Sequence, residues 1–200
     1  MRGERACSKR PCFSDCAAKE RKESGRIMHP LHKLIAKIIL ETELPGAHPV
    51  LGKDCGGDQQ IQLFCNGQAA RATRFCSVDA AVLKDGEVKI IIEIEESDIR
   101  PTALCGKVFV SAHASHFIHR GKSYPIAAHA SFMQVIDTRK LSPRSSKLTQ
   151  CSHLTELIRN TLSANDRHME YDIFYGDVAE FEQMEPRQEL QNHLRAASSL

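Results

Sequence analysis

The chain has 200 residues, which suits a single domain with a sizeable hydrophobic core. Hydrophobic residues make up 42% of it and charged residues 26%, as in an ordinary soluble globular protein, and the formal charge of +2 is too small to indicate nucleic-acid binding by itself. No apolar run is long enough to span a bilayer or to form the core of a signal peptide. Eight cysteines without such a signal favour reduced thiols, so we expect a cytoplasmic protein with no membrane partner.

The first 26 residues differ in composition from the rest of the chain. They are basic and contain almost no large apolar residues, which predicts a mobile arm or a small appended element ahead of one domain at residues 27–200.

Cysteines are concentrated in this N-terminal arm. Cys7, Cys12 and Cys16 lie within it, and His29 and His32 follow. Three thiolates and an imidazole can bind zinc, but the spacing is not that of paired C-x2-C knuckles. A zinc site and a basic arm without metal therefore both stay open.

Residues 28–44 are predicted to form an amphipathic helix. Their apolar residues recur at helical spacing, a proline fits the first turn, and Pro45-Gly46 ends the pattern. Glu41 falls three residues after Ile38 and seven after Leu34, so we expect it on the inward face. The alternative is that Glu41 is a solvated residue near the helix end.

Residues 78–95 carry the pattern of a β-hairpin. After a loop rich in Gly and Pro at 45–57 and a short strand at 59–64, apolar residues alternate at 78–83 and are followed by Asp85-Gly86, a strong hairpin-turn signal. The second arm is rich in isoleucine, which is typical of a central strand covered on both faces.

Three acidic residues interrupt this hairpin. Glu93 and Glu95 are two residues apart and so share one face of the strand, and Asp79 on the partner strand can lie close by. Converging carboxylates repel one another and are costly to desolvate. A divalent cation such as Mg²⁺ or Mn²⁺ would relieve both problems, with the backbone carbonyl of Ile94 as a further ligand. The alternative is an edge strand with a solvated acidic face.

A helix is predicted at residues 102–115, directly after the carboxylates. A helix start presents unpaired N–H groups and favours anions, so a phosphate can dock there. Arg100 and Lys107 are candidates for holding the charge of that phosphate, and the alternative is that both are ordinary exposed cations. His113, His116 and His119 are interpreted as surface residues at the end of this helix.

The remaining elements complete an α/β pattern. We predict strands at 132–137 and 171–175, helices at 148–162 and 181–197, and a basic loop at 139–147 that either binds phosphate or is simply solvated. Alternation of strand, helix and strand after a hairpin predicts a central mixed β-sheet with helices on both faces.

Asp79, then Glu93-Ile94-Glu95, then a helix with Lys107, resembles the active-site hairpin of the PD-(D/E)XK nuclease superfamily. That motif has an acid at the first strand, (D/E)-x-K on the second, and a helix packed behind. The resemblance implies a restriction-endonuclease-like core, with Asp79 and Glu93 as metal ligands. It also implies that Glu41 is an outer metal ligand or positions a water, because many members direct a first-helix glutamate towards the metal.

Glu95 stands where the superfamily usually has lysine. A glutamate there is similar to the E-x-E variant of some type II restriction endonucleases, and it leaves open whether Glu95 is a general base, a metal ligand or a sign of lost activity. The resemblance implies Mg²⁺-dependent hydrolysis of phosphodiester bonds in DNA, in restriction or repair, with a homodimer if both strands are cut.

Two other functions are compatible with the sequence. The missing motif lysine favours a catalytically inactive nucleic-acid-binding module on the same fold. Cys7, Cys12 and Cys16 favour a zinc-bearing interaction protein.

Overall fold

The computed structural model describes residues 29–96, 99–142, 145–164 and 168–200. The arm predicted at residues 1–26, with Cys7, Cys12 and Cys16, lies outside the described residues. The helices within these ranges are α1 (Pro30–Glu41), the short 3-10 helix η1 (Lys53–Cys55), α2 (Pro101–Ala112), α3 (Lys147–Ser163), α4 (Val178–Glu182) and α5 (Met184–Ser199). The strands are β1 (Ala47–Leu51), β2 (Ile61–Phe64), β3 (Arg74–Val78), β4 (Ala80–Lys84), β5 (Glu87–Glu95), β6 (His116–His119), β7 (Lys122–Ile136) and β8 (Glu170–Tyr175).

The described strands form one eight-stranded mixed sheet in the order β1-β4-β5-β7-β6-β2-β3, with β8 also paired to β7. The long strand β7 joins two parts of this sheet. Its first residues pair antiparallel with β6, and its last residues, 131–136, lie parallel to both β5 and β8. The remaining described pairs are antiparallel. The expected α/β architecture with a mixed sheet is confirmed.

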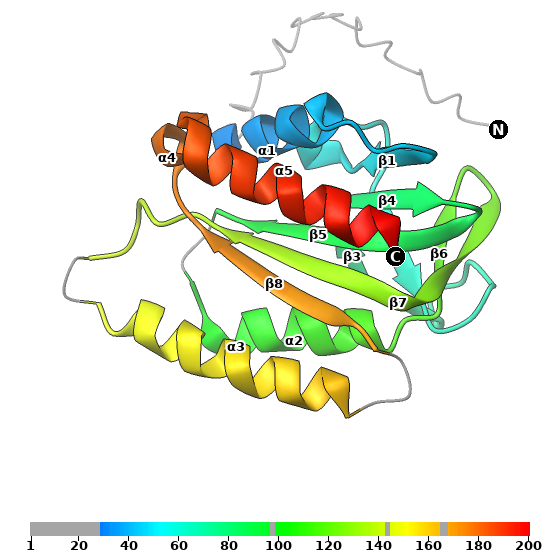
Figure 1. Cartoon of the computed structure of the whole chain (residues 1–200). Helices are drawn as coiled ribbons and strands as arrows, with labels where there is room; N and C mark the ends of the chain where they lie inside the picture. The colour runs from blue at the N-terminus through cyan, green and yellow to red at the C-terminus, as the bar shows by residue number, and fades with distance from the viewer. Residues whose placement is uncertain (1–28, 97–98, 143–144, 165–167) are drawn as a thin grey trace, which may run out of the picture.

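Helices cover both faces of the sheet (Figure 1). Helices α1, α4 and α5 lie on one face, and α2 and α3 lie on the other. Strand β5 runs between them, and its side chains alternate between the two layers: Ile90, Ile92 and Ile94 pack towards α1 and α5, whereas Val88 and Ile91 pack towards α2. The isoleucine-rich arm is therefore a central strand and not a solvated edge.

The predicted hairpin is confirmed as β4 and β5. Its turn places Asp85 at φ 53° and Gly86 at φ 81°, the left-handed conformation that a two-residue hairpin turn requires. The register then brings Ala80 opposite Ile92. Asp79, the residue before β4, consequently lies beside the end of β5 that carries Glu93 and Glu95.

Three predicted boundaries were wrong. Residues 47–51 form β1 and not loop; Pro49 is tolerated because β1 is an edge strand. Helix α2 ends at Ala112, so His116 and His119 lie in β6 and not at a helix end. The terminal helix is divided into α4 and α5. Within the described ranges, none of the helices combines the length and apolarity needed to cross a bilayer.

Candidate functional site

Asp79 is fixed by its backbone and by its side chain. Its N–H donates to the carbonyl of Ile92 at 3.0 Å, and its own carbonyl accepts from the N–H of Gly52 at 2.7 Å. Its carboxylate oxygen Oδ2 accepts from the N–H of Ile94 at 2.8 Å. A Cβ atom on Gly52 would lie 2.8 Å from the carbonyl oxygen of Asp79, so this close approach requires glycine. The carboxylate is thereby held against β5.

Glu93 faces Lys107, which reaches it from α2. The Lys107 Nζ lies 2.7 Å from Glu93 Oε1 and donates a second bond of 2.6 Å to the carbonyl of Ser77. The other carboxylate oxygen, Glu93 Oε2, is buried and has no hydrogen-bond partner among the described residues. A buried oxygen without a partner is unusual in a folded protein, although Ser131 Oγ is in the same state elsewhere in the described sheet.

The electrostatics of the site disfavour a second negative charge. Burial and the nearby charge of Asp79 raise the pKa of Glu93 to about 8, although Lys107 acts in the opposite direction. Burial lowers the pKa of Lys107, but Glu93 outweighs this effect and the net pKa is raised, so the lysine carries its charge. Burial, followed by Asp79 and other carboxylates, also raises the pKa of the Cys55 thiol.

Glu95 and Ile94 follow Glu93 on β5. Glu95 is half-buried and, being two residues along the strand, shares the face of Glu93, as the alternation predicts. Ile94 lies opposite Val135 of β7. Arg100 is the N-cap residue of α2 and is exposed. The structure thus pairs Lys107 with Glu93 and places Asp79 and Glu95 close enough to raise its pKa. The carboxylates of Asp79, Glu93 and Glu95, which are all described residues, do not all lie within 4.8 Å of one another, so the expected convergence of three acids is only partial.

Glu41 does not face the site, contrary to our expectation. It is exposed at the end of α1 and pairs with Arg187 of α5 and with Lys37, at 3.8 Å, on its own helix. The residue of α1 that points towards the carboxylates is His32, whose Nε2 lies 3.5 Å from Asp79 Oδ2. The prediction failed because Glu41 is the last residue of α1 and is exposed, although it follows the spacing of the buried Ile38.

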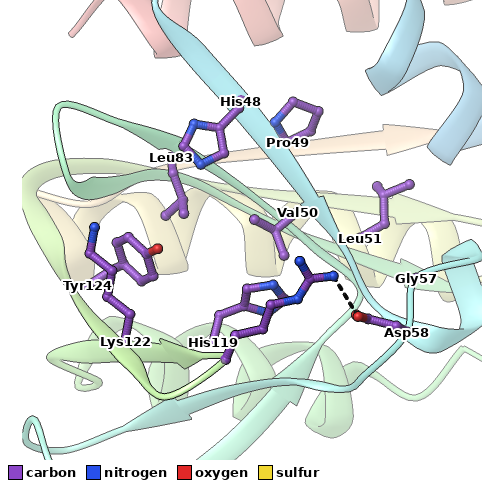
Figure 2. Close-up of a pocket in the computed structure, with 11 residues that line it drawn as sticks. His48, Pro49, Val50, Leu51, Gly57, Asp58, Leu83, His119, Lys122 and Tyr124 are labelled. Atoms are coloured by element: carbon purple, nitrogen blue, oxygen red, sulfur yellow. Dashed lines mark hydrogen bonds and ion pairs between the residues drawn. The ribbon is translucent and has the colours of Figure 1, made fainter.

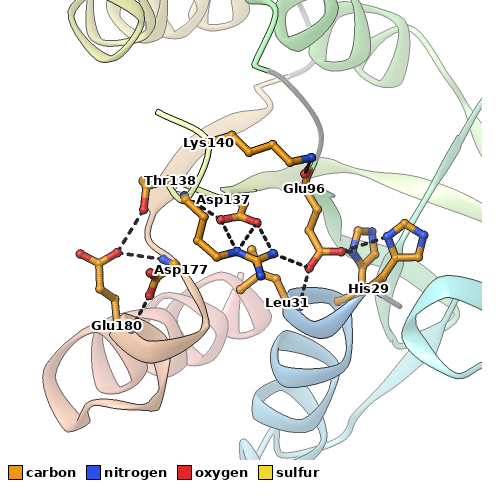
Figure 3. A network of polar contacts seen from close by, with 10 residues as sticks. His29, Leu31, Glu96, Asp137, Thr138, Lys140, Asp177 and Glu180 are labelled. Carbon is orange, nitrogen blue, oxygen red and sulfur yellow. Dashed lines mark hydrogen bonds and ion pairs between the residues drawn. The ribbon is translucent and has the colours of Figure 1, made fainter. Parts of the chain in front are cut away.

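A second polar cluster adjoins Asp79 at the start of α1 (Figure 3). Glu96 Oε2 lies 2.9 Å from His29 Nδ1 and 3.0 Å from His32 Nδ1, and Glu96 Oε1 accepts from the N–H of Leu31 at 2.5 Å. Among the described residues, His29, His32 and Glu96 are the group whose potential ligand atoms all lie within 4.8 Å of one another. Burial lowers the pKa of His32, but Asp79 and Glu96 outweigh this effect and raise it.

The predicted basic loop contributes two cations to this cluster. Arg139 holds Asp137 with both its Nε and its Nη2 and lies 3.6 Å from Glu96 Oε1. Lys140 donates to the backbone carbonyl of Glu96 at 2.8 Å. Arg139 therefore neutralises the buried Asp137, and Lys140 holds the backbone of Glu96.

Sequence reasoning missed His32 and Glu96 as members of the site. Glu96 directly follows the E-x-E pattern, and His32 belongs to a His-x2-His pair at the start of a predicted helix. In the sequence, the nearest metal-binding candidates to that pair are the upstream cysteines, which suggest a zinc site instead. The signal available in the sequence was that a His-x2-His pair can bind a metal. That the pair lies next to Glu96 depends on where α1 packs.

A pocket of about 660 Å³ lies along β1, next to the loop that supports Asp79 (Figure 2). His119, Arg120 and Lys122 come from the β6–β7 hairpin, and Tyr124 follows them on β7. Arg120 pairs with Asp58, another residue that lines the pocket, at 2.6 Å. The same loop, residues 51–57, borders the pocket and provides the contact to the backbone of Asp79.

Comparisons with protein-family models, with curated proteins and with solved structures find no match to this chain.

Proposed function

We propose that the protein is a metal-dependent nuclease that hydrolyses phosphodiester bonds in DNA. The observation that carries this proposal is the state of Glu93. Its carboxylate is buried beside the charge of Asp79, has one oxygen paired with Lys107, and has one oxygen without a partner among the described residues. A core does not require such a group, whereas a metal site does.

Asp79 and Glu93 fit a magnesium ion. Both offer carboxylate oxygens, the ligand type that Mg²⁺ prefers, and the backbone carbonyl of Ile94 is a further oxygen ligand. The unpartnered Glu93 Oε2 is the atom that such an ion would satisfy. When bound, the metal supplies a lowered pKa for a coordinated water and stabilises charge on the phosphate. Mn²⁺ accepts the same ligands.

The other residues supply charge and orientation. Lys107 brings a cation to Glu93 from α2, which supports a role in neutralising the phosphate. Glu95 lies on the face of Glu93 at the end of β5, where it would orient the attacking water or accept its proton. Arg100 at the start of α2 would hold the phosphate together with the N–H groups of the helix.

The pocket along β1 supports nucleic acid as the substrate. Its cations, Arg120 and Lys122, suit a phosphate backbone, and the ring of Tyr124 is of the kind on which bases stack. Because the pocket shares the 51–57 loop with Asp79, a strand bound there would continue towards the carboxylates. Cutting both strands of a duplex would require two copies of the site and hence a homodimer.

The second candidate is an inactive nucleic-acid-binding module on the same fold. The glutamate at position 95, where the motif has lysine, is the observation that favours it. The position of Lys107 weighs against it, because this lysine provides the missing cation from the neighbouring helix. The zinc-bearing interaction protein rests on cysteines that lie outside the described residues.

The test is a cleavage assay on plasmid DNA and on single- and double-stranded DNA and RNA oligonucleotides, with Mg²⁺ and with Mn²⁺. We expect metal-dependent cutting that Asp79→Asn and Glu93→Gln abolish and that the exposed control Glu182→Gln retains. DNA binding without cutting by the unaltered protein would select the inactive module. Full activity in either site variant would refute the site assignment.

A further inference from the structure

We propose that His29, His32 and Glu96 form a second metal site, which takes a transition-metal ion of the Zn²⁺ or Co²⁺ class. This site is separate from the proposed magnesium site and does not depend on the nuclease function. Its ligands are two imidazoles and one carboxylate, and imidazole suits Zn²⁺ and related ions and not Mg²⁺.

The three ligand groups already converge. The Nδ1 atoms of His29 and His32 lie 2.9 and 3.0 Å from the same oxygen, Glu96 Oε2. The rings are 5.0 Å apart, centroid to centroid, and meet at an angle of 62°, so they approach this oxygen from different directions. All ligand atoms lie within 4.8 Å of one another, and small adjustments of the side chains would place them around one ion.

The residues around His32 and Glu96 orient these side chains in the way that hydrogen-bonding partners usually orient metal ligands. A metal-bound histidine usually donates its other ring N–H to a carboxylate, and the Nε2 of His32 lies 3.5 Å from Asp79 Oδ2. Glu96 Oε1 is fixed by the N–H of Leu31, which leaves Oε2 directed at the two rings. This arrangement is an independent reason to regard His32 as a ligand, because it fixes both sides of the ring.

Burial and charge also suit a divalent cation. The side chains of His32 and Glu96 are each only 8% exposed, whereas that of His29 is 36% exposed and lies on the open side. With neutral imidazoles, Glu96 and Asp79 would bring two negative charges to the site. Asp137 is neutralised by Arg139, which also lies 3.6 Å from Glu96 Oε1, the carboxylate oxygen that is not directed at the two rings. Three protein ligands leave one position of a tetrahedral ion for water or a substrate atom.

Cobalt is the probe that tests this site, because Co²⁺ bound to nitrogen and oxygen ligands gives visible ligand-field bands. The titration uses the full chain with Cys7, Cys12 and Cys16 changed to serine, so that thiolates in the arm do not compete. We expect one equivalent of Co²⁺ to bind and Zn²⁺ to displace it. We expect excess Mg²⁺ to leave the bands in place.

Variants assign the ligands. We expect His29→Ala and Glu96→Gln to weaken Co²⁺ binding by at least about tenfold, and Asp79→Asn to weaken it by about 10-fold or more through the orientation of His32. The exposed His153→Ala on α3 is the matched control and should leave binding unchanged. Circular dichroism checks the fold of each variant. His29 is the most exposed of the three ligands, so its variant is the least expected to disturb the fold.

Two results would overturn the proposal. One is the absence of Co²⁺ bands in the serine-substituted protein, and the other is full binding by folded His29→Ala or Glu96→Gln. The nuclease proposal is tested separately by Glu93→Gln, which should abolish cutting but leave the Co²⁺ bands unchanged. Failure of one site can therefore be distinguished from failure of the other.

Discussion

Lys107 of α2 holds its ammonium group 2.7 Å from Glu93 Oε1 of β5, 14 residues earlier in the chain. The helix that follows the hairpin therefore brings a cation to the buried acid of β5. In the proposed resemblance to the PD-(D/E)XK motif, Glu95 stands at the lysine position, and Lys107 brings a lysine to Glu93 from α2 instead. This lysine favours an active enzyme over the inactive module in the proposed function.

Replacing Lys107 should separate charge from packing. We expect Lys107→Met to reduce cleavage by roughly 10²–10³-fold, because a positioned cation on a developing phosphate charge is typically worth that much. Lys107→Arg should retain part of the activity. Initial rates on a plasmid substrate measure both effects. Lys33→Met, at an exposed position of α1, is the control; equal losses in the Met variants of both positions would contradict a specific role for Lys107.

Glu93 should make the stability of the metal-free protein fall with rising pH. Its folded pKa of about 8 exceeds its ordinary value of 4.5, so the folded state binds the proton more tightly between these values. The free energy of unfolding should therefore decrease across this window, by at most about 1.4 kcal/mol per pH unit. Glu93→Gln should flatten the slope in denaturant titrations, and Glu182→Gln should not. An unchanged slope in Glu93→Gln would mean that Glu93 is ionised well below neutral pH.

Magnesium binding should strengthen as pH rises. The metal and a proton compete for Glu93, whose pKa is about 8 because of burial and the charge of Asp79. We expect the affinity for Mg²⁺ to rise by up to about tenfold per pH unit until about pH 8 and then to level off. Isothermal titration calorimetry in buffers with different ionisation enthalpies would also report the released proton. A pH-independent affinity would remove Glu93 from the ligand set.

Two glycines offer a matched pair of substitutions. Gly52→Ala would place a Cβ atom 2.8 Å from the carbonyl of Asp79, and we expect it to destabilise the fold by about 1–3 kcal/mol and to displace the carboxylate. Gly106 lies in α2 with no atom within 4 Å of such a Cβ. Gly106→Ala should stabilise the helix by about 0.5–1 kcal/mol. Thermal unfolding measures both, and unaltered stability and Mg²⁺ affinity in Gly52→Ala would contradict the close contact.

Local pattern was sufficient wherever the determining interactions lie within one element. Asp85-Gly86 alone predicts the hairpin turn, because few other residues adopt a positive φ. The isoleucine run predicts a central strand, since only such a strand is covered on both faces. The alternation along β5 correctly placed Glu93 and Glu95 on one face. By contrast, β1 and β6 depend on hydrogen bonds from distant strands. Pro49 in β1 and the two histidines of β6 are not typical strand residues, so the local pattern did not predict these two strands.

The sequence by itself determined the hairpin, the central strand, and the acidic pair on one of its faces, because these follow from strand period and turn chemistry. Tertiary structure alone decided that α1 presents His32 and not Glu41 to the hairpin, and that Glu96 meets His29 and His32. These contacts join residues more than 40 positions apart. They are set by how the helices pack on the sheet, which no local pattern records.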